Sequence, residues 1–204
     1  MNRTFTPRSM VFISFLGALS FLLMSIEVPL PFAPAYMKFE ISDLPALFGG
    51  FFLGPLAGTM ACLIKILLKL IVIGTHSALV GEMMNLFCSM AFVLTAAWYY
   101  HFHYNKKGAL HSLVLASLLG SAFAVFTNYY FAIPMYVRLY GIPLETILQM
   151  AAAANPFVHS MTGFLLLTIL PFNLVKYAVV SVIAFSVYKR ISLALQALIR
   201  HDAR

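Results

Sequence analysis

The chain has 204 residues, of which 62% are hydrophobic and 9% are charged, and its mean hydropathy is +0.94. Soluble domains carry about 25% charged and about 45–50% apolar residues, so this composition excludes a soluble globular domain and a disordered chain. It indicates an integral membrane protein. The net charge of +7 then fits basic residues that fix topology at the cytoplasmic face better than it fits nucleic-acid binding.

The first hydrophobic segment, 9–27, is expected to cross the membrane as a helix, because a span takes roughly 20 residues. Arg3 and Arg8 precede it as they would precede the core of a signal peptide, but no small-residue cleavage site follows. We therefore expect a retained span. Three prolines within 29–34 then end any helix, because proline lacks the N–H that a helix needs. Asp43 is expected to be the N-cap of the next helix.

Five further hydrophobic segments follow, and turn or breaker residues bound them. Gly54-Pro55 separates the second segment from the third. The polar loop 101–108 separates the fourth from the fifth, and Pro134 is expected to end the fifth helix. The connection 135–170 contains apolar stretches and is expected to be partly helical and partly inserted. The six expected spans are 9–27, 44–53, 56–73, 78–100, 109–132 and 171–188.

The charges assign the sides of the membrane. The N-terminus, the loop 101–108 and the C-terminal tail hold two, two and four of the thirteen basic residues. An even number of spans puts both termini on one side, and the positive-inside rule makes that side cytoplasmic. We therefore expect an all-α integral membrane protein with six transmembrane helices, both termini in the cytoplasm, and a single membrane domain over 1–204. Five of the six acidic residues fall on or near the outer half: Glu27, Glu40, Asp43, Glu82 and Glu145.

Polar residues near the outer ends of the helices are candidates for a binding site, because ionisable groups within hydrocarbon are costly and mark function. Glu82 and Asn85 are three residues apart and share a helix face. The alternative for Glu82 is that it satisfies free N–H groups at a helix start. Asn173 and Lys176 have the same spacing in the last span, and Asn128 lies near the outer end of the fifth. The alternatives are interhelical hydrogen bonding for Asn128 and snorkelling for Lys176.

Other polar and small residues carry weaker signals. Lys65 and Lys69 are four residues apart on the third helix. They could line the cavity, but we expect them to snorkel outward. Ser14 and Ala18 are small and four residues apart, which permits close approach of another helix from this chain or from a partner. The sequence contains no GxxxxGK[ST] motif, no credible metal site, and no nucleophile with a base placed by motif. We therefore expect no ATP hydrolysis by the P-loop route, and an intramembrane hydrolase has little support.

A distinctive run, KFEISDLPALFGGFFLGPLAG, extends from Lys38 to Gly58. It continues with IKILLKLIVIGT over 64–75 and VGEMMNLF over 80–87, and PFNLVK follows at 171–176. Together these motifs resemble the substrate-binding S-components of energy-coupling factor (ECF) vitamin transporters, and in particular the riboflavin-specific RibU family. The similarity is strongest over 38–87 and is collinear to the end of the chain.

The resemblance implies a protein that is not an enzyme, has no cofactor, and captures riboflavin at the outer face of the cell membrane for ATP-driven uptake. It implies partners in the bilayer and beside it, namely a transmembrane coupling protein (EcfT) and two ATPase subunits, and no nucleic acid. Asn128, Asn173 and Lys176 would hydrogen-bond the flavin or its ribityl chain. Ser14 and Ala18 would contact the coupling protein. Residues that would cover the site or line its other side are Glu40, Asp43, Gly81, Glu82 and Asn85.

The chain departs from the family pattern at three positions that bear on the assignment. Ser14-x-x-x-Ala18 stands where Ala-x-x-x-Ala is usual, Met84 replaces a small residue on the fourth helix, and Ile66 stands in an asparagine position. A related flavin or another vitamin is therefore an open alternative. The alternative from a different class is a small intramembrane enzyme or a structural membrane subunit. Flavin absorbance of the purified protein would separate a riboflavin-binding S-component from all of these alternatives.

Overall fold

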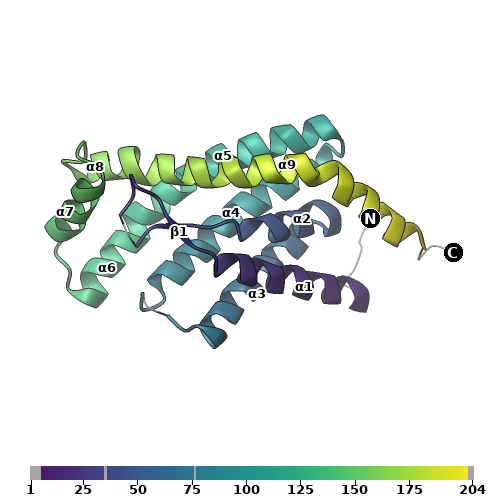
Figure 1. Ribbon diagram of the computed structural model, residues 1–204, viewed down its shortest axis with the longest axis horizontal. Coiled ribbons are helices and arrows are strands. Elements are labelled where there is room, and N and C mark those ends of the chain that lie inside the picture. Colours follow the sequence, from purple (N-terminus) through teal and green to yellow (C-terminus); the bar gives the residue numbers. More distant parts are fainter. Residues whose placement is uncertain (1–5, 35, 76, 202–204) are drawn as a thin grey trace.

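The computed structural model describes residues 6–34, 36–75 and 77–201, most of which are helical (Figure 1). The elements in chain order are α1 (Pro7–Met24), β1 (Val28–Pro29), β2 (Lys38–Phe39), α2 (Asp43–Leu53), α3 (Pro55–Val72), α4 (Val80–Phe102), α5 (Lys106–Thr127), the π-helix η1 (Asn128–Ala132), α6 (Ile133–Tyr140), α7 (Leu144–Ala154), α8 (Met161–Phe164), the π-helix η2 (Leu165–Ile169) and α9 (Leu170–His201).

Within the described residues, five helical segments are long and apolar enough to cross a bilayer. They are Pro7–Met24, Pro55–Val72, Val80–Phe102, Lys106–Tyr140 and Met161–Tyr188. The expected count of six spans is not confirmed, because α2 has 11 residues and extends about 16 Å, roughly half of the ~30 Å hydrocarbon layer. Eight of its residues are buried. The expected span 44–53 is therefore a short helix in the centre of the bundle.

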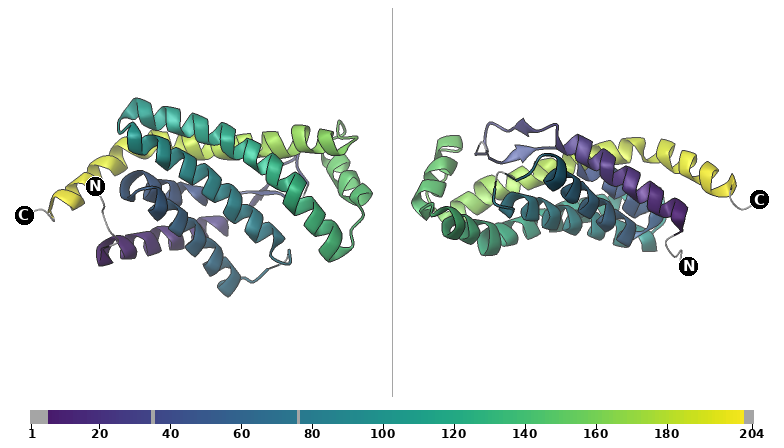
Figure 2. Two further views of the ribbon diagram at one scale, coloured as in Figure 1. Left: turned by 180° about the vertical axis from the view of Figure 1, so that it is seen from behind. Right: turned by 90° about the horizontal axis from the view of Figure 1, so that it is seen from below.

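The first turn of α1 and the last turn of α9 lie at the same end of the bundle, together with the connection between α4 and α5 (Figures 1 and 2). α1 runs away from this end, and the segment 25–42 turns back at the far side. β1 and β2 pair antiparallel in this segment, with Val28 opposite Phe39. Its last part is buried at Glu40 and Ser42, and irregular backbone at membrane depth is tolerated where protein surrounds it. α2 then returns through the middle of the bundle.

Two π-helices lie inside long helices and explain where the expected boundaries were wrong. Pro134 does not end the fifth helix, which continues through η1 into α6 as far as Tyr140. Likewise, the last span begins at Met161 and not at Pro171, because η2 joins α8 to α9. Each proline is the second residue after a π-helix, in the first turn of the α-helix that follows, and proline is tolerated in the first turn of a helix.

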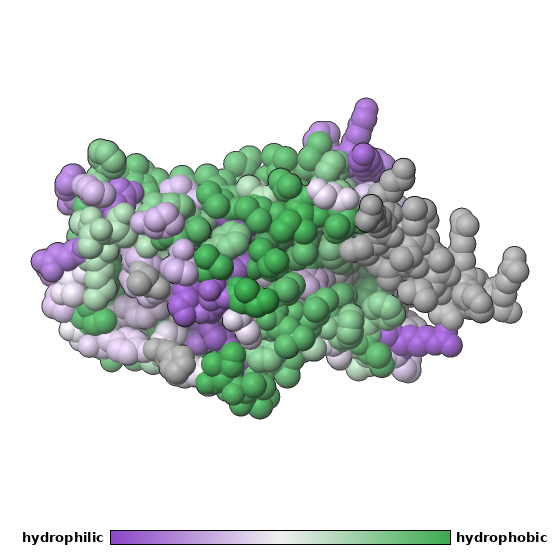
Figure 3. All heavy atoms as spheres, viewed as in Figure 1, coloured by the Kyte–Doolittle hydropathy of each residue, from purple (hydrophilic) through white to green (hydrophobic). Residues whose placement is uncertain are grey.

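Close packing of the helices depends on glycine at two positions. A Cβ at Gly17 of α1 would lie 2.6 Å from Ile64 Cγ2 on α3, and one at Gly58 of α3 would lie 2.6 Å from Val93 Cγ1 on α4. The main core forms around α2, with buried residues from α1, α3, α4, α5 and α9. A second, smaller core closes the far end beneath α6 and α7, and it comprises Ile133, Ile147, Ala151, Val158, Phe164, Leu165 and Ile169. Between the two ends, hydrophobic side chains dominate the face shown in Figure 3.

Candidate functional site

Four buried charged side chains meet where the extended segment enters α2. Glu40 and Asp43 come from the segment and the first turn of α2, while Lys65 and Lys176 reach in from α3 and α9. Their exposed fractions are 3%, 0%, 0% and 6% in that order. Two acids and two bases make the cluster formally neutral, as buried charges require in order to be tolerated. The cluster therefore joins four parts of the chain at one buried point.

Lys65 is the fully satisfied cation of the cluster. Its Nζ donates to Ser42 Oγ and to Asp43 Oδ1 at 2.8 Å each, and a third hydrogen bond of 2.9 Å goes to Ser89 Oγ on α4. These three bonds use all three donors of the ammonium group. The expectation that Lys65 snorkels outward is therefore wrong, because α2 and α4 supply acceptors inside the bundle.

Asp43 serves Lys65 and does not cap α2. Ser42 is the residue before the helix, and Asp43 is its first helical residue. The Oδ1 of Asp43 accepts from Lys65 and lies 2.5 Å from Ser89 Oγ. The expected N-cap role is thus wrong, because the carboxylate turns toward α3 and α4. Its other oxygen, Oδ2, is buried and accepts no hydrogen bond from the described residues.

Lys176 connects the last helix to the extended segment. Its Nζ donates to Glu40 Oε1 at 2.5 Å and lies 3.5 Å from Asp43 Oδ2. The Oε1 of Glu40 also accepts from Asn85 Nδ2 at 3.1 Å, and its Oε2 accepts from the Ser42 backbone N–H at 2.5 Å. Lys176 thus makes one hydrogen bond among the described residues and keeps donors that a ligand can use.

The carboxylate of Glu40 is held in its charged form. Glu40 lies in the segment before α2, outside the five spanning helices. Burial by itself raises the pKa of Glu40. The ammonium groups of Lys176 and Lys65 lower the pKa by more than burial raises it, so the pKa of Glu40 lies well below its usual range. The pair with Lys176 is therefore ionic at neutral pH.

Asn128 and Asn173 lie at the two π-helices, which contact each other. Asn128 begins η1, and its Nδ2 donates to the Ala124 carbonyl at 2.8 Å. Asn173 follows η2, and its Nδ2 donates to the Ile169 carbonyl at 2.9 Å. Neither Oδ1 accepts a hydrogen bond from the part of the chain that the structure describes. π-Turns occur often at functional sites, and no sequence pattern announced these two.

Glu82 holds the loop between α3 and α4. Its Oε2 accepts from Thr75 Oγ1 at 2.9 Å and from Ser77 Oγ at 2.6 Å, and its Oε1 lies 3.4 Å from Lys69 Nζ. The backbone N–H of Gly81 donates to the same Ser77 hydroxyl at 2.9 Å. Asn85, although it lies one turn along α4, reaches Glu40 instead. The two α4 residues that share a face therefore contact different partners.

The small residues of α1 lie on its outward side. Ser14 is exposed and Ala18 is half-buried. The buried residues of this helix are Ile13, Gly17, Ser20 and Met24. Another molecule can therefore contact this helix at Ser14, and partly at Ala18.

Comparison with known proteins finds relatives along nearly the whole chain. The model of the family described as "ECF transporter, substrate-specific component" matches residues 8–188. The chain is 29% identical over 185 residues to the riboflavin transporter RibU of Staphylococcus aureus (strain TCH60), which covers 91% of this chain and 90% of that protein. It is 29% identical over 179 residues to the riboflavin transporter FmnP of Bacillus subtilis (strain 168), with 86% and 87% covered.

A solved structure described as "Structure and mechanism of the S component of a bacterial ECF transporter" has the same fold. Its TM-score is 0.72 at 29% sequence identity, and the similarity covers 92% of this chain and 97% of that one.

Proposed function

The chain belongs to the family of substrate-specific components of ECF transporters, and we propose that it captures riboflavin in the membrane for uptake driven by separate subunits. Relatives that match over most of their length are named riboflavin transporters. The observation that carries the proposal is the buried, formally neutral cluster around Lys176, which makes one hydrogen bond among the described residues. Asn173 lies one helical turn away, and its amide oxygen accepts no hydrogen bond from the described residues. Riboflavin is neutral, planar and rich in hydroxyl groups, so it fits such a site without adding a charge.

We assign the polar contacts to residues on two elements, α9 and η1. Lys176 and Asn173 are one helical turn apart on α9 and share a face, and Asn128 approaches from η1. These side chains would hydrogen-bond the isoalloxazine ring or the ribityl chain. The remaining assigned residues cover the site, line its other side or hold the loop at its rim: Glu40, Asp43, Asn85, Gly81 and Glu82.

The site would open to the outer face of the cell membrane, with both chain termini in the cytoplasm. This orientation follows from the excess of basic residues at the end of the bundle that carries the first turn of α1 and the loop before α5. The chain has no ATP-binding motif of its own. Uptake against a gradient would therefore need the coupling protein EcfT and two ATPase subunits.

The direct test is the colour of the purified protein. We expect the protein to be isolated with bound flavin, or to quench riboflavin fluorescence with one binding site when it is titrated. Another vitamin as substrate, an intramembrane enzyme or a structural subunit would all give a colourless protein that leaves riboflavin fluorescence unchanged. That result would contradict the proposal.

Substitution of the asparagines should weaken riboflavin binding without unfolding the protein. Asn128→Ala or Asn173→Ala removes one hydrogen bond to a buried ligand, which costs about 0.5–1.5 kcal/mol, or up to roughly tenfold in Kd. Fluorescence titration measures the change. Asn155→Ala is the matched control, because Asn155 also donates to a backbone carbonyl, that of Leu167 at 3.0 Å, outside the site. If all three variants bind alike, the site assignment is wrong.

Glu40 should make no contribution to the pH dependence of riboflavin binding between about pH 5 and pH 8. Because the folded-state pKa of Glu40 is depressed, the stabilisation from its pair with Lys176 is fully present above the unfolded-state pKa of about 4.3. It is lost only as the pH falls through the lower, folded-state pKa. Titrations of wild type and Glu40→Gln across this range check the prediction. A loss of affinity between pH 7 and 5 that is absent from Glu40→Gln would contradict it.

A further inference from the structure

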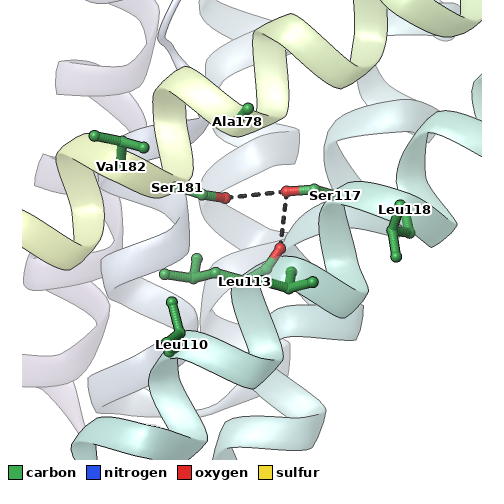
Figure 4. Close-up of a pocket in the computed structure, with 8 residues that line it drawn as sticks. Leu110, Leu113, Ser117, Leu118, Ala178, Ser181 and Val182 are labelled. Atoms are coloured by element: carbon green, nitrogen blue, oxygen red, sulfur yellow. Dashed lines mark hydrogen bonds between the residues drawn. The ribbon is translucent and has the colours of Figure 1, made fainter.

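An apolar groove lies between α5 and α9, and none of the four charged residues of the cluster lines it (Figure 4). It has a volume of about 260 Å³. Small side chains make the hollow, since Ser117 of α5 and Ser181 of α9 meet across it at 3.1 Å beside Ala178. Exposed bulky side chains of Leu110, Leu118 and Val182 stand around it.

The groove offers an occupant only van der Waals contact. The hydroxyl of Ser117 donates to the Leu113 carbonyl at 2.8 Å and, in that arrangement, accepts from Ser181. Both hydroxyls are thereby engaged within the protein, so no polar group is left to attract a polar ligand or to anchor a partner helix. The lining from Leu110 to Leu118 covers about 12 Å of helix, which is most of one ~15 Å leaflet of the hydrocarbon layer.

A basic cluster lies at one end of the groove. Lys106 precedes Leu110 by one turn, and Lys107 and His111 precede Val114 along the next ridge of α5, so helical spacing puts all three beside the groove mouth. All three are exposed. Lys106 Nζ lies 5.4 Å from the centre of the Phe185 ring on α9, so it sits where the two helices meet. The acidic residues of the described chain lie on 27–43 and at the starts of α4 and α7, away from this end.

We propose that this groove binds an anionic phospholipid, with one acyl chain between α5 and α9 and the headgroup phosphate at Lys106, Lys107 and His111. Charge complementarity selects the headgroup, because basic pockets between membrane helices bind anionic lipid headgroups. The apolar, hydrogen-bond-free lining accepts the acyl chain. The site is separate from the proposed riboflavin site and does not depend on it.

Native mass spectrometry of the purified full chain tests the proposal with two probes, phosphatidylglycerol and phosphatidylcholine of identical acyl chains. We expect wild type to retain one phosphatidylglycerol in preference to phosphatidylcholine at equal concentrations. Lys106→Gln and Lys107→Gln should each lower phosphatidylglycerol retention by about fivefold and leave phosphatidylcholine unchanged. Ala178→Leu fills the groove and should lower retention of both lipids.

Ala122→Leu is the matched control, because Ala122 is an exposed alanine on α5 outside the groove. It should retain lipid as wild type does, and all variants should elute as monodisperse, helical protein. Equal retention of the two lipids by wild type would overturn the headgroup assignment. Unchanged retention of both lipids by Ala178→Leu would overturn the groove assignment. If this variant kept its lipid but no longer bound the coupling protein, the occupant of the groove would be a protein helix instead.

Discussion

Lys65→Met should lower the free energy of unfolding by about 3–5 kcal/mol, because it removes one partner of a buried ion pair and leaves the other charge uncompensated. The side chains of Lys65 and Asp43 are both 0% exposed, and the ammonium makes three hydrogen bonds that tie α3 to the start of α2 and to α4. Methionine reaches as far as the lysine Cε and lacks only the ammonium group, so the loss reflects the charge and its bonds. Thermal unfolding of the purified protein in detergent measures the effect.

Lys69→Met provides the matched control for Lys65→Met. Lys69 lies one turn further along α3, its side chain is 19% exposed, and it contacts Glu82 at 3.4 Å, so its loss should cost far less. The double variant Lys65→Met/Asp43→Asn removes both charges and should recover part of the stability, because the penalty comes mainly from the unpaired carboxylate. Equal destabilisation by the two lysine substitutions would show that the buried cluster does not stabilise the fold.

The sequence predicted the helical membrane fold, and it singled out several polar residues that the structure brings together, because both depend on local patterns. Apolar runs of about 20 residues locate spans without knowledge of their neighbours. The spacing of Asn173 and Lys176 puts them on one face of any helix, and the structure keeps them on α9, with Lys176 bonded to Glu40.

The sequence did not predict the features that depend on distant partners. A lysine in an apolar run is expected to snorkel to the interface. Lys65 is buried instead because it finds acceptors at Ser42 and Ser89, which are 23 and 24 residues away in the sequence. The π-turns have no propensity signal either. Pro134 and Pro171 lie just after them, and on local rules such prolines end or begin helices.

Ala18→Trp should sharply lower riboflavin uptake in cells while the purified protein binds riboflavin with nearly normal affinity. Small residues at 14 and 18 permit close backbone contact with another membrane helix, and an indole at 18 would hold the coupling protein away. The proposed site lies around α9 and the segment before α2, whereas Ala18 lies half-buried on α1. The chain has no ATP-binding motif, so uptake depends on the partner subunits. Uptake should therefore fall sharply when the coupling protein cannot dock. Paired measurements on one variant test this, namely riboflavin titration and pull-down of the coupling protein from membranes.

Ser14→Trp separates loss of docking from loss of packing. Ala18 is half-buried beside Gly17, whose Cα hydrogen faces Ile64 with no room for a Cβ, so tryptophan at 18 can also disturb the contact between α1 and α3. Ser14 is exposed, and tryptophan there reaches only an outside partner, so it should give the same loss of uptake with unchanged unfolding temperature. Ala122→Trp, on the exposed side of α5, should leave uptake intact. If Ser14→Trp and Ala18→Trp abolish riboflavin binding but keep the coupling protein bound, then this face of α1 supports the ligand site, and docking takes place elsewhere on the bundle.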